Sequence, residues 1–282
     1  MTLRYRSRKL TNTLMFSFTG TCALISVSVL FFILGYLVWN GGKAVNLDFF
    51  TQLPKPPGEA GGGMANALVG SAEIVLIATL IGVPIGFLAG VYLAEFGGTL
   101  FPFLVRYTAD LLNGVPSIVI GMFAYALVVV PLHHFSALAG GIALSVILIP
   151  TTARATEQFL RAVPQHLREG ALALGASKWR AVASVVVPAA IRGVATGIIL
   201  GIARIAGETA PLLFTSFNNR YWSTGLSQPI ASMPVTIYTY AIAPYADWHR
   251  QAWAGGLILL LFMLGANICA RLILSRGPSW RS

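Results

Sequence analysis

Residues 111–153 read LLNGVPSIVIGMFAYALVVVPLHHFSALAGGIALSVILIPTTA and contain no Asp, Glu, Lys or Arg. A helix that crosses the hydrocarbon core of a bilayer needs about 20 apolar residues, so this run is too long for one crossing. Pro131 and the two histidines just beyond it divide the run into predicted spans of about 115–131 and 136–152. The stretch therefore predicts two membrane helices joined by a short turn.

Four further apolar runs predict the remaining membrane spans. They cover residues of about 14–38, 70–94, 193–214 and 252–270. The second of them is expected to be kinked or closely packed, because it contains Gly82, Pro84, Gly86 and Gly90. The chain of 282 residues is 56% hydrophobic and 10% charged, with a mean hydropathy of +0.75, far outside the soluble range. We therefore expect an all-α polytopic membrane protein, with a basic tail (1–13) before a single transmembrane domain (14–282).

The net charge of +10 results from 19 lysines and arginines against 9 acidic residues, and the cations gather at the ends of apolar spans rather than on one soluble face. This placement argues against a nucleic-acid partner and for contact with membrane lipid. Fourteen of these cations lie in the N-terminal tail, the 95–110 loop, the 153–192 loop and the C-terminus, and four lie in the alternate segments. Because positive residues accumulate on the cytoplasmic side, we expect a multi-pass inner-membrane protein with both termini and the 153–192 loop in the cytoplasm.

The 153–192 loop contains a pattern of small residues around a glycine. It reads Glu169-Gly170-Ala171-x3-Gly175-x9-Val185-x-Val187-Pro188. Residues 168–174 are good helix formers, Gly175 can end this helix in a left-handed conformation, and Ser177 can cap a second helix. Gly170 has no side chain and Ala171 has only a methyl group, so little protrudes from the helix there and another protein can approach its backbone closely. The alternative is an amphipathic loop in which the spacing arises by chance.

This pattern resembles the EAA signature of ABC-importer permeases, E-A-A-x3-G-x9-I-x-L-P. Gly170 stands for the first alanine, and two valines stand for Ile and Leu. The resemblance implies a type I ABC importer permease (MetI-like) architecture. It also implies that Glu169, Gly170, Ala171 and Gly175 form a coupling segment that docks a cytoplasmic ATPase.

Two ionisable residues, Arg204 and Glu208, lie near the middle of the predicted 193–214 span, where such groups are costly. They are four residues apart and therefore share a helix face. The same face carries small residues and a proline: Gly193, Gly197, Gly201 and Pro211. Glycines at this spacing predict a close helix contact, so we expect the ion pair to point into a protein interior. The pair is either purely structural, or Arg204 faces the path of an oxyanion, which a guanidinium contacts well.

Further motifs resemble the phosphate ABC importer permeases. They are Arg204-x-x-Gly207-Glu208-Thr209-Ala210-Pro211, Pro116-Ser117-Ile118-Val119-x-Gly121, and Tyr92-Leu93-Ala94-Glu95. The last span, with Ala252-Trp253-Ala254 at its start, looks like the A-type permease rather than its C-type partner. The resemblance covers roughly residues 66–275. It implies import of inorganic phosphate, a heterodimer with the C-type permease, two cytoplasmic ATPase subunits and a periplasmic phosphate-binding protein.

Other classes of function fit the residues less well. The adjacent His133 and His134 have no third ligand at useful spacing, so we expect no metal site and no enzyme. Cys22 and Cys269 fall inside apolar spans and are expected to be small buried residues. The chain lacks G-x-x-x-x-G-K-[ST], so we expect no cofactor on this chain and ATP hydrolysis on a partner. The remaining alternatives are import of another oxyanion (phosphonate, sulfate or molybdate) and, less favoured, a stand-alone secondary transporter.

Two long segments are predicted outside the membrane. Residues 41–66 are rich in Gly and Pro, which is typical of a linker with little regular structure. Residues 215–251 are rich in tyrosine and tryptophan. This second segment either lies at the membrane interface as an aromatic belt, dips back into the protein, or forms a docking surface for an external protein.

Overall fold

A computed structural model describes the backbone over residues 3–59, 61–96 and 100–275. These residues form helices joined by turns and contain no β-strand, which confirms the all-α fold. The α-helices are α1 (Leu3–Gly42), α2 (Leu47–Thr51), α3 (Ala65–Glu95), α4 (Leu100–Gly114), α5 (Ser117–Ala124), α6 (Val130–Leu132), α7 (Ala137–Arg161), α8 (Gln165–Ala173), α9 (Lys178–Ala181), α10 (Val187–Ala206), α11 (Ala210–Thr215), α12 (Met233–Ala241) and α13 (Ala246–Ser275). Two π-helical turns, Tyr125–Val129 and Val182–Val186, join α5 to α6 and α9 to α10.

The predicted membrane spans each overlap a long apolar helical segment. Within the described residues five such segments are long enough to cross a membrane: Arg8–Gly42, Ala65–Glu95, Ala137–Arg161, Lys178–Ala206 and Ala246–Ile273. A sixth candidate is the pair formed by α4 and the α5–α6 helix, which are bent by 104° relative to one another. The polytopic organisation predicted from the sequence is therefore confirmed.

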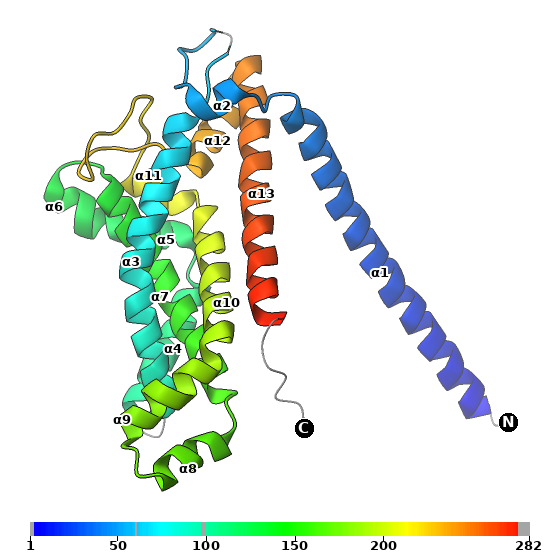
Figure 1. Ribbon diagram of the computed structural model, residues 1–282. Helices are drawn as coiled ribbons and strands as arrows, with labels where there is room; N and C mark the ends of the chain where they lie inside the picture. Colours follow the sequence, from blue (N-terminus) through cyan, green and yellow to red (C-terminus); the bar gives the residue numbers. More distant parts are fainter. Residues whose placement is uncertain (1–2, 60, 97–99, 276–282) are drawn as a thin grey trace.

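Helices α3, α7 and α10 form the centre of the molecule, with α13 beside α10 (Figure 1). Helix α1 leans away from this body and meets α13 only near its own C-terminal end, where Tyr36 contacts Trp253 edge to face. The start of α1 and helix α8 lie at one end of the molecule, called the α8 end below, and α13 runs toward this end but stops short of α8 (Figure 1). The opposite end carries α2 and α12. The N-terminal residues 1–2 and the cations Arg276 and Arg281 lie outside the described residues.

The predicted close packing of the 70–94 span is found between α3 and α7, the most extensive helix contact in the molecule. A Cβ atom at Gly86 would lie 2.7 Å from the carbonyl oxygen of Ile149, and one at Gly90 would lie 2.5 Å from Cβ of Thr156. Gly82 faces Leu148 in the same way. The absence of side chains on this stripe lets the two backbones approach, as in other membrane helix pairs.

The prediction of a loop over 95–110 is wrong from Leu100 onward, because helix α4 begins there. Arg106 and Asp110 interrupt the apolar pattern in the sequence, but both side chains are paired with residues of α7. The helix ends at Gly114, and Val115 precedes Pro116, which disfavours a helical conformation of Val115. The chain then turns sharply into α5.

The boundaries of two other predicted spans also need correction. Helix α7 continues to Arg161, past the predicted end at residue 152, and the α9–α10 helix starts at Lys178 instead of residue 193. In α7 the charged residues beyond the uncharged run pair with one another, since Arg154 and Arg161 both contact Glu157. Helix α10 also ends early, at Ala206, and the short helix α11 follows from Ala210. The 193–214 span is therefore not one helix.

The aromatic residues predicted outside the membrane divide into two groups. Tyr240 and Trp248 are buried and stacked, with ring centroids 4.4 Å apart, in a cluster that includes Phe49. Tyr221 and Trp222 are exposed. The first group forms a second core at the α2 end, so an aromatic belt or docking surface applies only to the second group.

Two smaller predictions are corrected. The 41–66 linker is not wholly irregular, since it contains α2, whose first turn is capped by the side chain of Asn46 accepting from the backbone N–H of Phe49 at 2.8 Å. Cys22 and Cys269 are free but exposed on their helices rather than buried in this chain. Both lie on surfaces of long apolar helices.

Candidate functional site

The coupling segment predicted around Glu169 forms helix α8 and the turn that follows it. Glu169 and Gly170 are exposed, and Gly175 has a φ of +82°, which confirms the predicted left-handed end. The N–H of Gly175 bonds to the carbonyl of Leu172 at 2.9 Å, and the N–H of Ala176 bonds to that of Ala171 at 3.2 Å. These two bonds form a Schellman motif. Ser177 occupies the predicted cap position of α9 without a side-chain cap bond.

The turn presents an apolar side chain to the outside. Leu174 is 91% exposed, although it sits between two helices and next to small residues. Trp179, at the start of α9, is also largely exposed. A soluble surface seldom leaves such side chains uncovered in one place, so the tip of α8 is suited to contact with another protein.

Helix α8 is attached to the body through the end of α3. Arg168 forms an ion pair with Glu95, and its Nη2 also donates to the carbonyl oxygen of Leu160 at 2.5 Å. Lys178 donates to the carbonyl oxygen of Glu95 at 2.9 Å and lies over the ring of Phe96, with Nζ 4.1 Å from the ring centroid. The orientation of α8 is thus set by charged contacts on both sides of its turn.

Arg204 and Glu208 do not have the arrangement predicted from a continuous helix. Arg204 is in the last turn of α10, whereas Glu208 follows the break and its N–H bonds to the carbonyl of Ile205 at 3.2 Å. The described residues contain no ion pair between these two side chains. Arg204 is exposed in this chain and Glu208 is half-buried. The ion pair predicted from the helical spacing is therefore not formed among the described residues, and the roles of the two residues stay predictions.

The glycines predicted to share this face do form a close helix contact. Gly193 faces the ring of Phe159, Gly197 faces Ala155, and Gly201 faces Leu148, all on α7. This confirms that part of the interpretation. The glycine face of α10 therefore packs against α7 of the same chain, while Arg204, about one turn after Gly201, is exposed.

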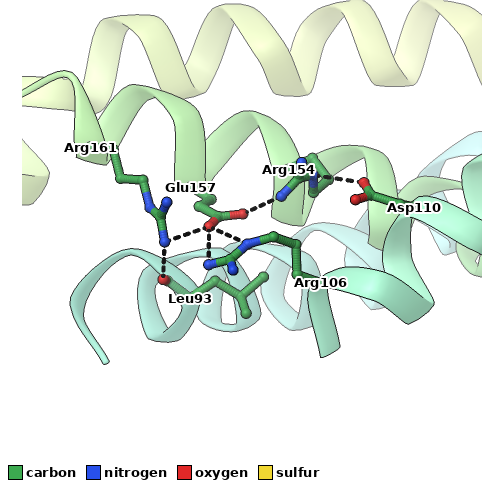
Figure 2. A network of polar contacts seen from close by, with 6 residues as sticks. All are labelled: Leu93, Arg106, Asp110, Arg154, Glu157 and Arg161. Atoms are coloured by element: carbon green, nitrogen blue, oxygen red, sulfur yellow. Dashed lines mark hydrogen bonds and ion pairs between the residues drawn. The ribbon is translucent and has the colours of Figure 1, made fainter. Parts of the chain in front are cut away.

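A charged cluster that the sequence analysis did not single out surrounds Glu157 on α7 (Figure 2). The side chain of Glu157 is only 3% exposed. Its Oε1 accepts from Nε of Arg106 at 2.9 Å and from Nη2 at 2.7 Å, and lies 3.0 Å from Nη2 of Arg161. Its Oε2 accepts from Nη1 of Arg154 at 2.6 Å. Three guanidinium groups therefore surround one buried carboxylate, and Asp110 pairs with one of them, Arg154.

The sequence carried a signal for this cluster. Arg154, Glu157 and Arg161 are three and four residues apart, so they share one helix face, and Arg106 and Asp110 do the same on α4. Arg106, Arg154 and Arg161 were assigned to loops when the charges were used to predict orientation. Their spacing is informative only once α4 and α7 are known to be helices. Within the described residues, no group of three or more His, Cys, Asp or Glu side chains is placed to hold a metal ion.

Comparison with known families defines the class of protein. A family described as "Binding-protein-dependent transport system inner membrane component" matches residues 82–276. The chain belongs to this family of integral inner-membrane transport components.

The particular relatives are phosphate permeases. The chain is 46% identical over 271 residues to the "Phosphate transport system permease protein PstA" of Haemophilus influenzae, covering 96% of both chains. It is 46% identical over 261 residues to the protein of that name from Yersinia pestis, covering 90% of this chain and 88% of the relative. A "Probable phosphate transport system permease protein PstA" of Methanocaldococcus jannaschii is 34% identical over 253 residues, covering 89% of both.

Solved structures share the fold at lower sequence identity. A chain of the MetNI methionine ABC transporter in an inward-facing conformation matches with a TM-score of 0.56 and 18% identity, covering 74% of this chain and 97% of that chain. An amino acid ABC transporter matches with a TM-score of 0.56 and 16% identity, covering 76% and 92%. The fold is that of a MetI-like ABC importer permease.

Proposed function

We propose that this chain is the A-type permease subunit of an ATP-driven importer of inorganic phosphate and forms half of its translocation pathway. The observation that carries the proposal is the 46% identity to a phosphate permease over 96% of both chains. The fold of an ABC importer permease supports the same assignment. The chain is a transport component whose energy comes from a partner.

That partner is a cytoplasmic ATPase, two copies of which bind at the α8 ends of the permease dimer. Glu169, Gly170, Ala171 and Gly175 shape the docking segment, and the exposed Leu174 at its tip supports this role. The chain has no phosphate-binding loop of its own and binds no cofactor, so ATP is hydrolysed on the ATPase. Closure of the ATPase dimer pushes on α8 and rocks the helices between two states of access.

Arg204 and Glu208 act in the phosphate pathway. The exposed guanidinium of Arg204, at the end of a membrane helix, can contact two phosphate oxygens at once. Glu208 lies beyond the helix break and limits how tightly the anion is held, so that phosphate is released. Its carboxylate can also accept a hydrogen bond from protonated phosphate, which sulfate cannot donate at neutral pH. The purely structural alternative loses support because the pair it requires is not formed among the described residues.

The remaining partners complete the path. A C-type permease forms a heterodimer with this chain, a periplasmic phosphate-binding protein delivers the anion at the α2 end, and membrane lipid surrounds the long helices. Both termini and α8 are cytoplasmic in this arrangement. The start of α1 and helix α8 lie at one end of the molecule and α13 runs toward that end, which supports this orientation (Figure 1).

Uptake by membrane vesicles that carry the complete complex tests the substrate. Labelled phosphate should accumulate, and a 100-fold excess of sulfate, molybdate or methylphosphonate should leave the rate nearly unchanged. Vesicles from cells that lack only this chain are the control and should show background uptake. Strong competition by one of the other oxyanions would transfer the assignment to that anion.

A further inference from the structure

The Glu157 cluster joins three helices at the α8 end of the molecule (Figure 2). Arg106 comes from α4, Arg154 and Arg161 come from α7, and Arg161 also donates to the carbonyl oxygen of Leu93 on α3 at 3.2 Å. Asp110 extends the cluster along α4 through an ion pair with Arg154, with 2.9 Å between Oδ1 and Nε. None of these residues belongs to the coupling segment or to the pathway residues described above.

We propose that this cluster is a rigid joint that makes α4 move with α7 and α8 as one body. In this way it carries the motion of the coupling segment to the chain around Glu208. The proposal rests on the proposed function, because it assigns a role in coupling within that importer. Glu157 is a positioning residue, since it acts through α4 and does not touch the anion.

The chemistry of the joint favours a permanent contact over one that opens in each cycle. Both oxygens of the Glu157 carboxylate are bonded to guanidinium groups, and the side chain is almost wholly buried. Separating α4 from α7 would leave this carboxylate buried with fewer partners, which is strongly unfavourable. Arg106 contacts one oxygen through two nitrogens, which also fixes the direction of α4.

Helix α4 depends on these polar contacts because it buries little apolar surface. Only Pro102 and Ala109 are buried among its described residues. At its far end Asn113 accepts a hydrogen bond from the hydroxyl of Thr151 on α7 at 3.2 Å. The polar contacts with α7 therefore run along α4 from Arg106 to Asn113.

A continuous set of contacts leads from the coupling segment to this joint. Arg168 of α8 is paired with Glu95, two residues after Leu93, whose carbonyl accepts from Arg161. Lys178, on the other side of the α8 turn, binds the backbone of Glu95. A displacement of α8 is thus passed to the end of α3 and to the Glu157 cluster through charged groups.

The joint is also connected to the pathway residues. Helix α4 leads through the bend at Pro116 into α5, which packs against α11. The contact is tight at Gly121, where a Cβ atom would lie 2.7 Å from Cα of Pro211. Since α11 starts two residues after Glu208, movement of α4 and α5 displaces the chain next to the proposed anion path.

Distances between spin labels test the rigid joint directly. After replacement of Cys22 and Cys269, one label is placed on α8 at His166 and a second on α4 at Phe103 or on α13 at Ile268; all three positions are exposed. On trapping nucleotide in the assembled complex, the α8–α13 distance should change and the α8–α4 distance should stay constant. An α8–α4 change as large as the α8–α13 change would overturn the joint. No change in either pair would contradict coupling through α8.

Variants at the joint test its role in transport. Glu157→Gln should lower phosphate uptake per assembled complex by about tenfold while ATP hydrolysis continues, and should broaden the α8–α4 distance distribution. Asp110→Asn is the graded comparison: it removes the exposed outer carboxylate of the same cluster but leaves the contacts of Glu157 in place, so it should lower uptake less than Glu157→Gln does. Equal effects of the two variants, or unchanged uptake in Glu157→Gln, would refute the proposal.

A double variant separates a joint from independent effects. The double variant Arg106→Gln, Glu157→Gln should take up phosphate no more slowly than the less active of the two single variants, because both substitutions remove the same contact. Multiplicative losses would contradict a shared contact. If the Glu157→Gln complex cannot be isolated, the spin-label distances are still measurable in the complex that keeps Glu157. A constant α8–α4 distance would then support the joint, and a changed one would refute it. Those distances need no phosphate, so failure of the phosphate assignment is recognised separately, as absent uptake in the unaltered complex.

Discussion

Gly175 ends α8 because of its backbone conformation and not because of crowding. Its φ is +82°, and a Cβ atom added there would meet nothing within 4 Å. A β-branched residue in this left-handed conformation costs about 1–2 kcal/mol or more. The turn would therefore reorganise, and the exposed tip of α8 would change direction.

We predict that Gly175→Val reduces ATPase association and phosphate uptake together. Gly20→Val on α1 is the control, since it lies outside the docking segment and a Cβ atom there also meets nothing within 4 Å. Co-purification of the ATPase with each variant measures the effect. Normal co-purification and uptake in both Gly175→Val and Glu169→Lys would remove the docking role of this segment.

Arg204 has the most direct predicted effect on the anion. Replacing its guanidinium by a neutral amide removes charge-assisted hydrogen bonds of about 1.5–3 kcal/mol. Uptake per assembled complex should fall about 10- to 100-fold in Arg204→Gln. Glu208→Gln should have a smaller effect, and Arg271→Gln, an exposed cation at the end of α13, should have almost none. Near-normal uptake in Arg204→Gln would exclude Arg204 from the pathway.

At the scale of helices, the α3–α7 contact depends on absent side chains. A Cβ atom at Gly90 would lie 2.6 Å from the carbonyl oxygen of Ala153, so Gly90→Val must push the two helices apart. We expect a loss of about 1–3 kcal/mol in stability. Gly20→Val on α1, where a Cβ atom meets nothing within 4 Å, is the control and should be tolerated. Thermal unfolding in detergent compares the two, and equal midpoints would argue against this contact.

The orientation of the helices is tested by labelling single cysteines after replacement of Cys22 and Cys269. An impermeant thiol reagent should label Glu59→Cys and Gly225→Cys from outside intact spheroplasts, because both lie in segments with few cations. Gln165→Cys on α8 should be labelled only after permeabilisation. Labelling of residue 165 in intact spheroplasts would reverse the orientation and place α8 away from the ATPase.

The sequence predicted the long apolar helices well because a bilayer-crossing helix must be apolar over a fixed length. The turn at Gly175 was also predictable, since glycine is the residue that best tolerates its conformation. Helix α4 was missed because Arg106 and Asp110 looked like loop charges, and their partners Glu157 and Arg154 are far away in the sequence. The break after Ala206 was missed because Arg204 and Glu208 were interpreted as a pair on one continuous helix, although Gly207 ends α10 and Pro211 lies in the first turn of α11.

The whole molecule has features of a component that is completed by others. Helix α1 is exposed from Arg8 to Ile33, Arg204 is exposed, and the tip of α8 presents Leu174 to the outside. In the proposed assembly lipid covers α1, the second permease lies next to Arg204, and the ATPase covers the tip of α8. A stand-alone secondary transporter would not require the last two.

The energy source tests the central claim most directly. Proteoliposomes containing the two permeases and the ATPase, with the binding protein outside and ATP inside, should accumulate labelled phosphate. Uptake should stop when ATP or this chain is omitted and should persist when ionophores collapse every ion gradient. Phosphate uptake that continues without ATP and disappears with the ionophores would contradict the account, because it would identify the chain as a gradient-driven transporter.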